Sequence, residues 1–186
     1  PGSTFKPINL ALALQEGVIQ PNETVYDSGA LTIGGWPIRN HDRKGNGVVD
    51  FATVLQVSSN VGMVQAMRNM RPSYYWDWLS RLGLDAKPDT DLPGAVAGQL
   101  KTKEQFTTLP IEPAPAAFGQ GSSLTPLQLV QLHALIPNVV RLVCPHITRG
   151  LSAGHALAPS GERMGQTLLR PEVTRSVLNW MEAVVE

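Results

Sequence analysis

The fold is decided by the stretch Pro1-Gly2-Ser3-Thr4-Phe5-Lys6-Pro7, in which a serine and a lysine stand three residues apart. Apolar residues recur at helical spacing after it and Gly17 is a stop signal, so we expect a helix over residues 3–16. Ser3 and Lys6 then share one helix face, with about 5–6 Å between their Cβ atoms. A serine hydroxyl becomes a nucleophile when a base takes its proton, and a desolvated lysine amine can be that base.

A second polar stretch, Ser58-Ser59-Asn60, lies between two predicted helices. Asp50 is a good N-cap for the first helix, over residues 51–57, and the second is expected over residues 61–70. Taken singly, each stretch has an ordinary explanation: a capping serine with a solvated lysine, and a polar connection between helices. Taken together, S-x-x-K at a helix start followed by S-x-N on a later loop is a pattern of β-lactamases and penicillin-binding proteins.

The rest of the chain predicts a helix-rich structure with short β-prone runs between residues 21 and 49. Helices are expected to begin at Pro72, at Thr125-Pro126 and at Pro171, because proline is favoured at the first helical position. Residues 139–143 are β-prone, and residues 152–166 are polar and expected to form an exposed loop. Glycine-rich turns are expected at residues 45–47 and at residues 119–121, where the backbone must approach another segment closely.

Composition excludes several functional classes. The 15 basic and 15 acidic residues leave no net charge to attract nucleic acid, and 42% apolar residues are enough for a packed core. A single cysteine excludes an internal disulfide framework and a cysteine-rich zinc site. The four histidines show no metal-ligand spacing, so we expect no metal, no cofactor and no nucleic-acid partner.

Several stretches, in their order along the chain, resemble class B penicillin-binding proteins, most of all the FtsI-type peptidoglycan transpeptidase of cell division. They are Pro1–Pro7, Ser58-Ser59-Asn60-Val61-Gly62, Asp91-Leu92-Pro93-Gly94, Gly119-Gln120-Gly121 and Leu124-Thr125-Pro126-Leu127-Gln128. The resemblance implies the α/β (α+β) fold of penicillin-binding proteins and β-lactamases, an antiparallel sheet flanked by helices. Residues 1–186 would be a partial transpeptidase domain, mainly its helical part with few short strands. It would be cut before the sheet upstream of the first motif and before the K-T-G strand.

The resemblance also implies roles for four residues. Ser3 would attack the D-Ala–D-Ala carbonyl of a stem peptide, and Lys6 would be its general base. Ser58 would relay a proton to the departing D-alanine, and Asn60 would hydrogen-bond Lys6 and the substrate amide. The backbone N–H of Ser3 would form half of the oxyanion hole. The implied partners are peptidoglycan stem peptides, β-lactams and membrane proteins of the division machinery, at the extracytoplasmic face of the bacterial membrane.

The family's third motif, K-T-G on a strand, is absent from residues 1–186. Lys101-Thr102-Lys103 is no substitute, because its third residue is wrong and it precedes a predicted helix start at Glu104. We therefore expect the isolated chain to turn over poorly. Two alternatives remain open: a non-catalytic remnant that serves as a binding or scaffold module, and a class A penicillin-binding protein or β-lactam sensor of the same fold.

Overall fold

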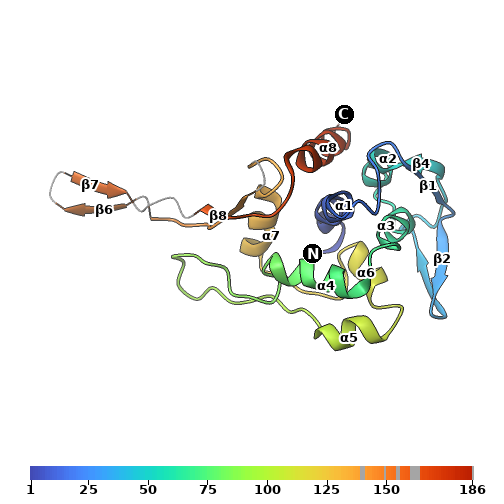
Figure 1. The fold of residues 1–186 in the computed structure, drawn as a ribbon, viewed down its shortest axis with the longest axis horizontal. Helices are drawn as coiled ribbons and strands as arrows, with labels where there is room; N and C mark the ends of the chain where they lie inside the picture. The colour runs from blue at the N-terminus through green and yellow to red at the C-terminus, as the bar shows by residue number, and fades with distance from the viewer. Residues whose placement is uncertain (139–140, 149, 154–155, 160–163, 186) are drawn as a thin grey trace.

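One buried helix organises the molecule. The computed structural model describes residues 1–138, 141–148, 150–153, 156–159 and 164–185. A short 3-10 turn, η1 (Gly2–Phe5), leads into α1 (Lys6–Gln15), and every residue of α1 from Lys6 to Leu14 is buried. Figure 1 shows α1 in the middle of the body, and it contacts helices on several sides. The predicted helix is confirmed, but its burial extends around the helix rather than along one stripe, as in the core of a larger domain.

The other helices surround α1, and most begin where the sequence predicts. They are α2 (Phe51–Gln56), α3 (Asn60–Met67), α4 (Pro72–Arg81), α5 (Lys103–Thr108), α6 (Pro113–Ala117), α7 (Pro126–Ala134) and α8 (Pro171–Glu182). Asp50 caps α2 by accepting from the Thr53 N–H at 2.8 Å, and proline stands in the first turn of α4, α7 and α8. Helix α6 was not predicted, since its alanines and prolines carry no amphipathic pattern.

The strands are short and pair two by two, always antiparallel. β1 (Thr24–Asp27) pairs with β4 (Gly47–Asp50), β2 (Ala30–Ile33) with β3 (Trp36–Arg39), β5 (Arg141–Val143) with β8 (Met164–Thr167), and β6 (Gly150–Ala153) with β7 (Ala156–Pro159). The β-prone runs before residue 39 are confirmed as strands. The predicted turn at residues 45–47 is wrong in its last residue, because Gly47 already belongs to β4.

The expectation of an exposed loop over residues 152–166 is wrong for the part that the structure describes. Ala153 and Ala156 face each other across β6 and β7, and Met164 pairs with Val143 of β5. Backbone pairing can form strands where the side chains show no alternation, so the sequence carried no period-two signal here. Figure 1 shows β6 and β7 extending away from the helical body. Residues 139–140, 154–155 and 160–163, which complete the segments in these predictions, lie outside the described residues.

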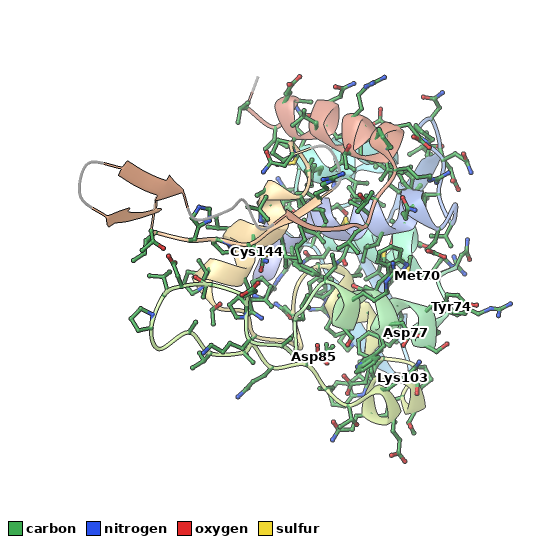
Figure 2. The ribbon with its side chains drawn as sticks, turned by 60° about the vertical axis from the view of Figure 1, so that its left-hand side comes forward. Met70, Tyr74, Asp77, Asp85, Lys103 and Cys144 are labelled. Carbon is green, nitrogen blue, oxygen red and sulfur yellow. The ribbon has the colours of Figure 1, made fainter. Side chains whose placement is uncertain are left out.

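Buried polar contacts tie the helices to one another. The Asn9 amide of α1 donates to the carbonyls of Ala116 and Ala117 at 2.8 and 2.9 Å, and accepts from the Tyr75 hydroxyl at 2.9 Å. Asn9 therefore joins α1, α4 and α6. Asp77 of α4 forms an ion pair with Lys103 at the start of α5, with 2.6 Å between the carboxylate oxygen and the ammonium nitrogen (Figure 2).

No helix among the described residues combines the length and the apolar character that crossing a bilayer requires.

Candidate active site

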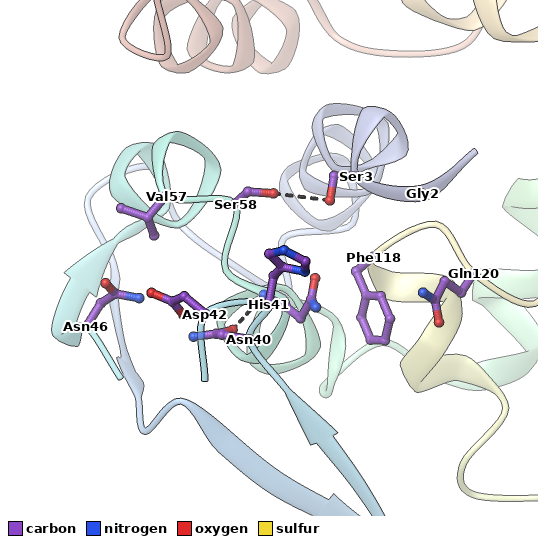
Figure 3. Close-up of a pocket in the computed structure, with 11 residues that line it drawn as sticks. Gly2, Ser3, Asn40, His41, Asp42, Asn46, Val57, Ser58, Phe118 and Gln120 are labelled. Carbon is purple, nitrogen blue, oxygen red and sulfur yellow. Dashed lines mark hydrogen bonds between the residues drawn. The ribbon is translucent and has the colours of Figure 1, made fainter. Parts of the chain in front are cut away.

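Three of the four predicted site residues meet at one cavity between η1 and the α2–α3 connection. The cavity has a volume of about 480 Å³, and Ser3, Ser58 and Asn60 are among its lining residues. In Figure 3 the Ser58 hydroxyl is turned toward Ser3, with the His41 side chain nearby. The fourth residue, Lys6, is 1% exposed and reaches Ser58 from within the protein.

A short hydrogen-bonded chain links the serine of the first motif to its lysine. The Ser58 hydroxyl lies 3.1 Å from the Ser3 hydroxyl and donates to it. The Lys6 ammonium donates to the Ser58 hydroxyl at 2.9 Å and to the Ser58 carbonyl at 2.6 Å. Ser58 thus connects Ser3 and Lys6 through hydrogen bonds.

Burial lowers the pKa of Lys6. Removal from water disfavours the charged ammonium, and this desolvation lowers the pKa of Lys6 from 10.5 to about 8. A lysine with a pKa of about 8 is neutral in roughly a tenth of molecules at pH 7, far more than an exposed lysine, and the neutral form is the one that accepts a proton. Among the described residues, the hydroxyl and the carbonyl of Ser58 both accept from Lys6 and hold its ammonium in place.

Ser58 adopts an unusual backbone conformation. Its φ of 54° lies in the left-handed region, which a residue with a Cβ seldom occupies. The conformation is fixed on both sides, because the Ser58 N–H donates to Leu55 at 3.1 Å and the Ser59 N–H donates to Val54 at 2.9 Å. It places the carbonyl and the hydroxyl of Ser58 together on Lys6.

Asn60 departs from its predicted contact. Its side-chain amide donates to the Arg39 carbonyl at 3.0 Å, and among the described residues Lys6 finds its hydrogen-bond acceptors on Ser58 instead. The predicted bond between Asn60 and Lys6 is therefore wrong for this structure. The reason is that the end of β3 passes beside the first turn of α3 and offers a free backbone acceptor there.

The glycine-rich segment forms another wall of the cavity, through Phe118 and Gln120. Gly119 has a φ of 80°, and a Cβ on it would lie 2.0 Å from the Gly2 carbonyl oxygen. The Gly2 N–H also donates to the Gly119 carbonyl at 2.8 Å. The predicted structural role of this segment, close backbone approach, is confirmed, and the approach is to the residue beside Ser3.

Sequence reasoning missed two polar residues at this site: Asn40, which lines the cavity, and Asp27, which is buried beside Asn40. Both are buried, and both contact Ser59, which N-caps α3. They stand 32 and 19 positions before Ser59 and match no short motif. The only signal was weak: each is a polar residue at the end of a short β-prone run.

A serine joined through a second serine to a buried lysine, at a cavity and a helix start, is the arrangement of serine acyl-transferring proteins. The family model described as "Penicillin binding protein transpeptidase domain" matches residues 1–186. The chain therefore belongs to the penicillin-binding protein transpeptidase domain family, and within it to the FtsI-type, class B group.

Named relatives agree with this assignment. The FtsI homologue of Chlorokybus atmophyticus is 41% identical over 163 residues, which cover 82% of this chain and 24% of the relative. The peptidoglycan D,D-transpeptidase FtsI of Escherichia coli K12 is 33% identical over 184 residues, covering 99% of this chain and 29% of the relative. The chain thus spans about a quarter of the length of these curated relatives.

Solved structures confirm the fold. The transpeptidase domain of penicillin-binding protein 3 from Burkholderia pseudomallei superposes with a TM-score of 0.85 at 29% identity, covering 100% of this chain and 53% of that one. Penicillin-binding protein 3 from Mycobacterium tuberculosis, complexed with aztreonam, superposes with a TM-score of 0.89 at 25% identity, covering 100% and 41%. The predicted mixed fold, with helices dominating and strands short, is confirmed.

Among the described residues, no group of three or more histidine, cysteine, aspartate or glutamate side chains is placed to hold a metal ion.

Proposed function

We propose that the chain carries the acylation centre of a peptidoglycan D,D-transpeptidase. The Ser3 hydroxyl attacks the carbonyl of the penultimate D-alanine of a stem peptide, and its proton passes through Ser58 to neutral Lys6. The C–N bond to the last D-alanine breaks, and the proton returns through Ser58 to that leaving amine. An amine of a second stem peptide then attacks the ester on Ser3, which forms the cross-link and restores the serine.

The observation that carries this proposal is the continuous hydrogen-bonded path from Ser3 through Ser58 to Lys6 at the wall of a cavity. Each hydroxyl along the path can pass a proton without moving by more than a hydrogen-bond length. The buried position of Lys6 supports its role as base, because desolvation keeps part of it neutral. Asn60 lines the same cavity and remains a proposed contact of the substrate amide.

The wider setting belongs to the proposal as well. We expect β-lactams to acylate Ser3 as mimics of the D-Ala–D-Ala end, at the extracytoplasmic face of the membrane and alongside division proteins. Residues 1–186 would form part of a larger transpeptidase domain whose K-T-G strand binds the substrate carboxylate and supplies the second oxyanion donor. The coverage of only 53% of the Burkholderia pseudomallei transpeptidase domain supports this expectation.

Intact-mass spectrometry after incubation with benzylpenicillin tests the proposal on the full-length gene product. The expected result is one covalent adduct, which peptide mapping places on the peptide containing Ser3. Ser3→Ala should abolish it, while Ser176→Ala should retain it, because Ser176 is a half-buried serine on α8 whose hydroxyl donates to Glu172 of the same helix. A folded wild-type protein without an adduct would refute the acylation centre.

A further inference from the structure

A buried carboxylate lies behind the Ser58–Asn60 connection and belongs to no step of the proposed reaction. Asp27, at the end of β1, is 1% exposed. Its oxygens accept from the Gly29 N–H at 2.8 Å, the Asn40 amide at 2.9 Å, the Asn46 amide at 2.6 Å and the Ser59 hydroxyl at 2.8 Å. All four donors are neutral, so the carboxylate is stabilised by hydrogen bonds rather than by a cation.

Asn40 extends this network to the backbone of the site. Its side-chain oxygen accepts from the N–H groups of Asn60 and Val61 at 2.9 and 3.1 Å, and contacts the Ser59 hydroxyl at 3.2 Å. Its amide is oriented by Asp27, because both carboxylate oxygens accept from it. The Ser59 hydroxyl in turn accepts from the Gly62 N–H at 2.8 Å. Asp27 thus determines which way both capping side chains of α3 point.

The residue next to this capped turn is Ser58, whose left-handed backbone needs its neighbours to hold it. The Ser59 hydroxyl donates to Asp27, and the Ser59 N–H donates to the Val54 carbonyl. With its following residue immobilised on both sides, the Ser58 carbonyl and hydroxyl can remain together on Lys6. The network therefore acts on the reacting groups without touching them.

We propose that Asp27 is a positioning residue of the acylation centre, acting through Ser59 and Asn40 to hold Ser58 between Ser3 and Lys6. The effect of Asp27 on acylation rests on the proposed function. Its effect on the backbone of residues 60–62 can be measured without any reaction. An amide in place of the carboxylate has the same shape and only one acceptor oxygen. In place of Oδ2 its nitrogen would face the donors of Asn40, Asn46 and Ser59, and in place of Oδ1 those of Gly29 and Asn40, so either orientation sets a donor against donors.

Asp50 provides a matched control. It stands at the opposite end of the same two-stranded ladder, since Thr24 pairs with Asp50 and Asp27 pairs with Gly47. It also accepts a hydrogen bond at a helix N-terminus, from Thr53 at 2.8 Å. Its helix is α2, and its contact does not involve the Ser59–Asn40 network. Asp27→Asn and Asp50→Asn therefore make the same chemical change at two helix starts, of which only the start of α3 directly adjoins Ser58.

The test compares wild type, Asp27→Asn and Asp50→Asn in the full-length gene product, by the second-order rate constant of penicillin acylation and its pH profile. Asp27→Asn should lower the rate constant by up to about 100-fold, as misplacement of reacting groups by about 1 Å does. It should also raise the midpoint of the pH profile, because a loosened Ser58 lets water reach Lys6. Asp50→Asn should leave both unchanged. Ser59→Ala should slow acylation and should not add to the effect of Asp27→Asn, since the two act in one path.

Amide hydrogen exchange gives the readout that needs no activity. Asp27→Asn should speed exchange at Asn60, Val61 and Gly62, and Asp50→Asn should speed it at Thr53 instead. Wild-type acylation or wild-type exchange at residues 60–62 in folded Asp27→Asn would overturn the proposal. A wild-type protein that does not acylate would refute the proposed function, while exchange would still decide the positioning role. If Asp27→Asn does not fold, Ser59→Ala carries the same two expectations.

Discussion

The two helix starts that meet at the cavity are held in opposite ways. The start of α1 has no side-chain cap, and it is fixed by burial of every residue from Lys6 to Leu14. The start of α3 is fixed by hydrogen bonds, through the Ser59 cap and the Asp27–Asn40 network beneath it. One side of the site therefore depends on apolar packing and the other on buried polar contacts.

This difference fits the work proposed for each side. Packing around α1 desolvates Lys6, which is what lowers its pKa. Hydrogen bonds are directional, so they suit the α2–α3 connection, where Ser58 must hold a strained orientation. Packing therefore lowers the pKa of the proposed base, Lys6, and hydrogen bonds orient the proposed proton relay, Ser58.

The largest effect should come from removing the base on the packed side. Lys6→Met keeps an unbranched apolar side chain that is one atom shorter and lacks the amine, and we expect penicillin acylation to fall by about 10²–10⁴-fold. Stability at pH 7 should be maintained or increased, because a desolvated charge is lost. Stopped-flow acylation and thermal unfolding measure the two. A variant that acylates normally would show that Lys6 is not the base.

A core substitution on α1 that leaves the site residues in place should lower stability. Leu12 is 0% exposed on α1, and Leu12→Ala should lower the free energy of unfolding by about 2–5 kcal/mol. Urea denaturation measures this, with Leu109→Ala as the control, since Leu109 is 53% exposed. Equal losses for the two variants would contradict the assignment of α1 as the core of the packed side.

The pH dependence of stability should report the same packing. The pKa of Lys6 is about 8 in the folded protein and 10.5 when exposed, so the unfolded chain binds more protons between these values. The free energy of unfolding should therefore rise by about 3 kcal/mol as the pH rises from below 8 to above 10.5.

The difference in the free energy of unfolding between wild type and Lys6→Met, followed against pH, isolates the contribution of Lys6. Other groups also contribute near this pH range. Tyr75 is among them, because burial raises its pKa in the folded protein while the same side chain titrates normally in the unfolded chain. These groups are common to both proteins and cancel in the difference. A difference that stays flat between pH 8 and pH 10.5 would show that Lys6 is hydrated in the folded protein.

The smallest effect should come from the hydrogen-bonded side. Ser59→Ala removes one cap of α3, which typically lowers the free energy of unfolding by about 1 kcal/mol. Its denaturation midpoint should fall much less than that of Leu12→Ala, although Ser59 lies nearer to the reacting groups. A loss of unfolding free energy as large as that of Leu12→Ala would contradict the claim that apolar packing around α1 contributes more to stability than the hydrogen bonds at the start of α3.

The sequence predicted what local signals determine. The starts of α2, α4, α7 and α8 follow from one capping residue or one proline, and Ser3, Lys6 and Ser58 follow from motif spacing. The contact of Asn60 with Arg39 and the Asp27 network could not be predicted, because they depend on how β1, β3 and α3 pack. The pairing of β6 with β7 was missed for a related reason, since no side-chain alternation marks it.

The contact between Gly119 and Gly2 has a consequence for resistance to inhibitors. Because any side chain at position 119 would collide with the backbone next to Ser3, substitution there should disturb the proposed nucleophile together with the wall of the proposed inhibitor site. Side chains at the rim, such as His41 and Asp42, are under no such restriction. A covalent inhibitor that gains its selectivity from the backbone wall at Gly119 should therefore be harder to escape by mutation than one that depends on the rim.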